Sequence, residues 1–137
     1  MDIKLKTLII KIKPEYLIVA SLAIIYFVFG LLKVAGMSPV EKLVIEVNKW
    51  FGEDKFFILG LIEMGLAVGL IIPKIRFIFA VLIFLHLISV SILTLFFPAF
   101  LFSNETGLTI EGQFVLKNLV LLSAAYYLIW KKVSKND

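Results

Sequence analysis

The sequence of 137 residues contains no cysteine and only one histidine, His86. Without cysteine the chain cannot form disulfides, and it has no thiolate for metal binding, nucleophilic attack or redox chemistry of its own. A single histidine argues against a self-contained haem or zinc site, because such sites usually need several nitrogen or sulfur ligands. The sequence therefore predicts no metal site.

Charged residues are also scarce for a chain of this length. Hydrophobic residues make up 61% of the sequence and the mean hydropathy is +1.05, whereas soluble domains are roughly 45–50% apolar. A small domain has too much exterior to hide so many apolar side chains from water. The net charge of +4 does not point to nucleic acid, because the lysines mostly flank apolar runs, as they do in membrane proteins.

Four apolar runs have about the length of a membrane-spanning helix, which is roughly 17–25 residues. They cover residues 16–33, 56–72, 77–97 and 114–130. Each is expected to be helical, because a spanning segment must satisfy its own backbone hydrogen bonds. The predicted fold is all-α, with residues 1–137 forming a single domain that is a four-helix transmembrane bundle. A signal peptide is the alternative interpretation of the first run, but that run is too long and no clear cleavage site follows it.

The basic residues outside these runs predict the orientation of the bundle. They gather in the amino-terminal arm, the second loop and the tail, whereas the third loop, residues 98–113, contains none. Because basic segments stay on the cytoplasmic side, both termini and the second loop are expected in the cytoplasm. The first loop is expected outside, with a short amphipathic helix that begins at Ser38 and Pro39 and extends to Phe51.

Polar side chains from all four runs are expected to share the outer half of the bundle, where they form a buried polar cluster or ligand site. The candidate site residues are Lys33, Glu63, His86, Gln113, Lys117 and Asn118. Ionisable residues inside a membrane are costly and are therefore functional-site candidates by default. Lys33 or Lys117 within a few ångströms would keep Glu63 ionised.

Helical spacing places several of these residues on common stripes. Tyr26, Gly30 and Lys33 share one stripe, because residues three and four apart are neighbours on a helix. Gly65 and Gly69 form a small-xxx-small pattern that favours close approach of a second helix.

Each candidate also has a simpler interpretation. Lys33 and Lys117 are long enough to extend to the outer headgroups without any buried partner. Glu63 fits a purely structural ion pair that sets helix register, and His86 fits a hydrogen-bonded histidine in the core.

Several segments resemble the DoxX-like superfamily of four-helix membrane proteins, and in particular its YkgB-type branch. The segments are FGLLK (29–33), GMSPVEKLV (36–44), LGLIEMGLAVGLII (59–72) and, most specifically, GLTIEGQFVLKNLVLLSAA (107–125). The resemblance implies an antiparallel bundle in a bacterial inner membrane and a link to oxidative or sulfur stress. Some members are similar to membrane subunits of quinone-linked oxidoreductases, and distant relatives are similar to assembly or transport factors.

These observations lead to one main functional hypothesis and two alternatives. The main hypothesis is a pocket for a small lipid-soluble ligand such as a quinone, with Glu63 as the buried charge or proton acceptor and Lys33 and Lys117 as its counterions. Asn118, His86 and Gln113 would orient the ligand by hydrogen bonds. The first alternative is a non-enzymatic partner or assembly factor for another membrane protein, and the second is a small transporter or channel built from a homo-oligomer.

Overall fold

The computed structural model describes residues 13–38, 41, 53–96, 98–103 and 107–134. Its main elements are four long helices: α2 (Pro14–Val34), α4 (Glu53–Ile71), α5 (Arg76–Leu95) and α7 (Ile110–Val133). These helices coincide with the four apolar runs, so the helical prediction is confirmed for each run. The amphipathic helix predicted between Pro39 and Phe51 lies almost entirely outside the described residues.

A small hairpin region joins α5 to α7. It contains the short helix α6 (Pro98–Leu101) and two antiparallel strands, β1 (Phe102–Ser103) and β2 (Gly107–Leu108). Gly107 has a positive φ of 73°, a conformation that glycine adopts without a steric penalty. The side chain of Thr109 then caps α7 by accepting a hydrogen bond of 3.0 Å from the backbone N–H of Gly112. Residues 107–112 (GLTIEG) therefore form the turn and the start of α7. They belong to the segment that carries the family resemblance.

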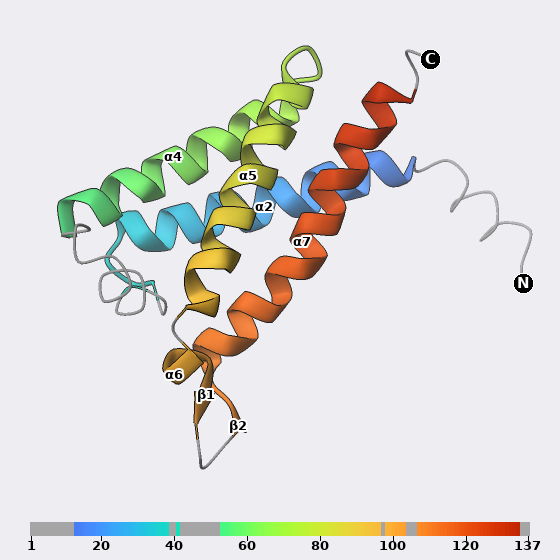
Figure 1. Cartoon of the computed structure of the whole chain (residues 1–137). Coiled ribbons are helices and arrows are strands. Elements are labelled where there is room, and N and C mark those ends of the chain that lie inside the picture. The colour runs from blue at the N-terminus through green and yellow to red at the C-terminus, as the bar shows by residue number, and fades with distance from the viewer. Residues whose placement is uncertain (1–12, 39–40, 42–52, 97, 104–106, 135–137) are drawn as a thin grey trace, which may run out of the picture.

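The four long helices pack as two side-by-side pairs that cross each other (Figure 1). One pair is α2 with α4 and the other is α5 with α7, and α4 also contacts α5. Consecutive long helices run in opposite directions. The contacts of Glu15 and Arg76 show this, since they bring together the start of α2, the end of α4, the start of α5 and the end of α7.

Gly30 of α2 and Gly60 of α4 mark the closest approach of these two helices. A Cβ atom at Gly30 would lie 2.6 Å from the carbonyl oxygen of Gly60, and a Cβ at Gly60 would lie 2.7 Å from the carbonyl oxygen of Gly30. Both distances are far below van der Waals contact and involve backbone atoms that cannot rotate away. Only glycine at both positions lets the two backbones touch.

The sequence predicted that Gly65 and Gly69 would promote the close approach of a second helix. For Gly65 this prediction is wrong. A Cβ at Gly65 would meet nothing within 4 Å, because this glycine faces outward. Gly69 does make a close contact, since a Cβ there would lie 2.3 Å from the ring of Phe79 on α5.

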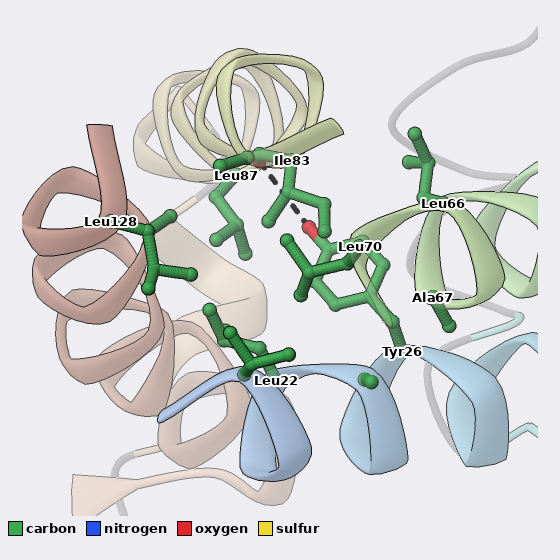
Figure 2. Close-up of a cluster of buried hydrophobic side chains, with 12 residues drawn as sticks. Leu22, Tyr26, Leu66, Ala67, Leu70, Ile83, Leu87 and Leu128 are labelled. Atoms are coloured by element: carbon green, nitrogen blue, oxygen red, sulfur yellow. Dashed lines mark hydrogen bonds between the residues drawn. The ribbon is translucent and has the colours of Figure 1, made fainter. Parts of the chain in front are cut away.

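The apolar core occupies the part of the bundle where all four long helices are in contact (Figure 2). Leu22, Leu70 and Ile83 are almost completely buried, with 1%, 0% and 0% of their surfaces exposed. Ala125 and Leu128 bring α7 into the same cluster. The close packing of these side chains against one another helps to hold the two pairs together.

Glu15, Arg76 and Lys131 tie three helices together at one end of the bundle. The Glu15 carboxylate lies 3.2 Å from Nη1 of Arg76 and 2.6 Å from Nζ of Lys131. Arg76 also donates to the carbonyl oxygens of Leu70 and Ile71, at 3.1 and 3.3 Å, at the end of α4.

Two of the described helices, α2 and α7, are long and apolar enough to cross a membrane. The described part of α5 adds a shorter apolar helix, Arg76–Ile92. Many large apolar side chains are on the outside of the molecule, such as Ile24 with 62% and Val120 with 71% of its surface exposed. An outer surface of this kind is the one that lipid tails would cover.

We expect Gly30→Ala and Gly60→Ala each to lower the free energy of unfolding by about 1–3 kcal/mol, the usual cost of overpacking. The added methyl group would force α2 and α4 apart. Gly65→Ala is the matched control in the same helix, and it should raise stability by up to about 1 kcal/mol, because alanine is the better helix former. Denaturant unfolding in detergent, followed by circular dichroism, measures all three variants. Equal effects at positions 60 and 65 would contradict the close approach.

Candidate functional site

Lys33 and Glu63 form a buried ion pair between α2 and α4. Nζ of Lys33 donates to Oε2 of Glu63 at 2.6 Å, and 7% of each side chain is exposed. The charges of the two groups cancel locally, which lowers the cost of keeping either of them away from water. The pair therefore turns two residues that are individually unfavourable in an apolar setting into one neutral polar unit.

His86 of α5 extends this unit to a third helix. Its Nε2 lies 3.7 Å from Oε1 of Glu63, whereas Lys33 donates to the other carboxylate oxygen, Oε2. This distance is longer than an ordinary hydrogen bond. The His86 side chain is 21% exposed, against 7% for Glu63, so His86 is the more accessible of the two.

Tyr26 of α2 completes the arrangement on the other side of the imidazole. Its hydroxyl oxygen lies 3.0 Å from Nδ1 of His86 and 3.4 Å from the carbonyl oxygen of Ile83, and the second contact is drawn in Figure 2. Tyr26 is 4% exposed, and its ring meets the imidazole edge-on, with 5.8 Å between centroids. The polar cluster, defined here as Lys33, Glu63, His86 and Tyr26, is thus a continuous row across three helices.

The spacing of residues along α2 and α4 explains why the row forms at this level. On α2, Tyr26, Gly30 and Lys33 recur at intervals of four and three residues, so they share the face that meets α4. On α4, Gly60 and Glu63 share a face in the same way. The glycine contact lies one turn from Lys33 and Glu63, and a Cβ at Gly60 would lie 2.9 Å from Cβ of Lys33. The close helix approach therefore sets the short distance of the ion pair.

Phe56 closes the cluster on the side of the first loop. It is 2% exposed, and its ring centroid lies 5.9 Å from Nζ of Lys33. An ammonium at this distance from an aromatic face gains a cation–π attraction. Phe56 also keeps water from the ion pair and so strengthens the attraction between the two charges.

The structure brings Lys33, Glu63 and His86 together, as predicted, but it places Gln113 and Lys117 elsewhere. Both of these α7 side chains are exposed, and Nζ of Lys117 lies 5.1 Å from the ring centroid of Phe114 on its own helix. The expectation that Lys117 would be buried as a second counterion of Glu63 is therefore wrong. Asn118 is half-buried.

The helical turn explains the different positions of these α7 residues. Each residue is rotated by about 100° from the one before it, so Lys117 and Asn118 cannot both face the bundle. The buried face of α7 near the core carries Ala125 and Leu128, and Asn118 lies seven residues before Ala125, on the same side.

Two parts of the site and one structural cluster were not predicted from the sequence. Tyr26 was predicted to share a helical stripe with Lys33 but was not included among the site residues. Its position seven residues before Lys33 already indicated that both side chains lie on the same buried face. The Gly30 and Gly60 contact joins two helices and cannot be read from either alone. The bridging role of Glu15 was also missed, because its partners Arg76 and Lys131 are distant in sequence.

Among the described residues, no group of three or more histidine, aspartate or glutamate side chains is arranged to hold a metal ion. Comparisons of the chain with protein-family models, with curated proteins and with solved structures give no match. The resemblance to the DoxX-like superfamily therefore stays a prediction that rests on the sequence segments themselves.

We expect Lys33→Met and Glu63→Gln each to be destabilising, because each leaves a buried polar group without its partner. Breaking a buried ion pair from one side typically costs about 3–5 kcal/mol. The double variant should lose clearly less than the sum of the two single losses, since no uncompensated charge remains. Lys117→Gln is the control and should change stability by no more than about 0.5 kcal/mol, as is usual for an exposed side chain. Additive losses in this double-mutant cycle would mean that the two residues do not interact.

Proposed function

We propose that this chain is a DoxX-like integral membrane protein whose polar cluster binds a small lipid-soluble ligand such as a quinone. The observation that carries the proposal is the 2.6 Å ion pair of Lys33 and Glu63, with His86 from a third helix beside it. Ion pairs buried among apolar helices are costly to maintain and are retained mainly at functional sites. The proposed role belongs to redox or oxidative-stress metabolism, in a bacterial inner membrane.

The membrane location is supported by the sequence and by the helices together. α2 and α7 are long and apolar enough to span a bilayer, and we propose that α4 and α5 span it as well. Basic residues gather at the end where α4 joins α5, where Lys74 and Arg76 lie near Lys131. By the positive-inside rule this end faces the cytoplasm, so both termini are cytoplasmic and the polar cluster lies toward the outer side.

The chemistry of the cluster suits a ligand with a quinone-like head. Such a site needs apolar walls and a few fixed polar groups. His86 is the accessible member, while Lys33 and Glu63 lie behind it as a paired donor and acceptor. A ligand that enters from the lipid would meet the imidazole first, and the ion pair would set the electrostatic environment of its head group. Glu63 is the proposed proton acceptor.

Site-specific labelling tests the topology. The chain has no cysteine, so each introduced cysteine is unique. Met37 is 70% exposed at the end where the polar cluster lies, and Ser134 is exposed at the other end of the bundle. In intact cells, a membrane-impermeant maleimide should label Met37→Cys and leave Ser134→Cys unlabelled, whereas permeabilised cells should label both. The reverse pattern, or equal labelling in intact cells, would contradict the proposed orientation.

Photoaffinity labelling tests the ligand. A photoreactive benzoquinone should label the purified protein on peptides that contain Glu63 or His86, and unlabelled duroquinone should compete. For the quinol form, duroquinol, Glu63→Gln should weaken the competition at least about tenfold, because a quinol hydroxyl can donate a charge-assisted hydrogen bond to the Glu63 carboxylate. Lys117→Gln should compete like the wild type, because its ammonium lies outside the cluster. Labelling spread evenly over the helices, or unchanged competition in Glu63→Gln, would contradict quinone binding at this site.

A further inference from the structure

We infer that Tyr26 holds His86 in the tautomer whose proton is on Nε2, and that the site thereby selects a ligand hydroxyl, such as that of a quinol, over a carbonyl. The ligand part of this inference rests on the proposed function. The tautomer part rests only on the geometry of Tyr26, His86 and Glu63.

The contacts of the Tyr26 hydroxyl decide where its proton points. The hydroxyl has a single proton and two acceptors nearby, Nδ1 of His86 at 3.0 Å and the carbonyl oxygen of Ile83 at 3.4 Å. Hydroxyl hydrogen bonds to oxygen usually measure about 2.5–3.0 Å, so the contact with Ile83 is long. The Ile83 carbonyl also lies within α5, where it accepts from the backbone N–H four residues later. The proton of Tyr26 is therefore best placed on the line to Nδ1.

The opposite nitrogen of the imidazole leads to the same tautomer. Nε2 lies 3.7 Å from Oε1 of Glu63, and a carboxylate oxygen only accepts hydrogen bonds. If Nε2 had no proton, its lone pair would face the lone pairs of a negatively charged oxygen. With the proton on Nε2, a positive N–H edge faces the carboxylate, and Nδ1 is free to accept from Tyr26. Tyr26 is thus a positioning residue, because it fixes the tautomer through a hydrogen bond and does not itself reach the ligand.

The gap between Nε2 and Oε1 then presents a donor and an acceptor side by side. A ligand oxygen that approaches the two atoms from the side, off the line that joins them, can lie about 2.8 Å from each, because the two atoms are only 3.7 Å apart. A hydroxyl oxygen placed there accepts from Nε2–H and donates its own proton to Glu63. A carbonyl oxygen accepts from Nε2–H but brings its lone pairs against the carboxylate. The geometry therefore favours the reduced, hydroxyl-bearing form of a quinone-type ligand.

The single histidine makes the tautomer directly measurable. In protein whose histidine is labelled with ¹⁵N, the two ring nitrogens of His86 give the only imidazole signals of the chain. In the ligand-free wild type we expect a protonated Nε2 and an unprotonated Nδ1. In Tyr26→Phe we expect a larger share of the tautomer with the proton on Nδ1, because the hydrogen bond to Nδ1 is gone and only Glu63 still favours the proton on Nε2. Tyr16→Phe, on an exposed tyrosine of the same helix, is the control and should keep the wild-type signals.

Binding of duroquinol and duroquinone, measured under anaerobic conditions by competition with the photoreactive probe, tests the ligand part. Wild type should bind duroquinol about three- to tenfold more tightly than duroquinone, the effect of one additional hydrogen bond. Tyr26→Phe should lose most of this preference while Tyr16→Phe retains it. A protonated Nδ1 in the wild type overturns the inference without need of any variant. Equal binding of both forms overturns the ligand selection alone, whereas binding of neither form overturns the proposed function and leaves the tautomer result standing.

Discussion

The contact between Lys33 and Glu63 depends on how closely two helix backbones approach each other. α2 and α4 touch at Gly30 and Gly60. Because the two helices are antiparallel, Lys33 and Glu63 lie on either side of this contact, each one turn from the glycine of its own helix. If larger residues separated the helices, the pair would lengthen and water or lipid would enter between the charges. Attraction between charges in an apolar setting falls with distance without much screening, so a small separation here has a large energetic effect. Backbone packing and site electrostatics are therefore parts of one constraint.

The two ends of the bundle use charge in different ways. At one end, Glu15 joins Arg76 and Lys131 at partly buried positions, and these ion pairs set which helix ends meet. In the other half, Glu63 and Lys33 are buried, and their pairing is essential once both are present. Between the two lies the apolar core. This division separates a part that holds the fold from a part that is available for ligand chemistry.

Local patterns predicted most of the fold, and the errors arose where two helices had to be considered together. Hydropathy and terminal signals located all four long helices, because both are properties of one segment. The buried positions of Lys33 and Glu63 followed from the cost of charges in apolar surroundings. Lys117 was assigned to the same cluster, although a rotation of one residue turns it outward. Gly65 was preferred to Gly60 because a small-xxx-small pattern does not specify which face meets a neighbour.

The order of the charged residues along the chain has a consequence for biogenesis. Lys33 is synthesised before Glu63, and the two lie on consecutive long helices that form one hairpin-like pair. Once α4 has left the ribosome, its carboxylate already has a counterion on the preceding helix. In the proposed membrane orientation, α2 and α4 can thus enter the bilayer with the charges of Lys33 and Glu63 already paired, before α5 and α7 have been made. Exchanging Lys33 with a residue of the second half would remove that advantage even if the finished fold were the same.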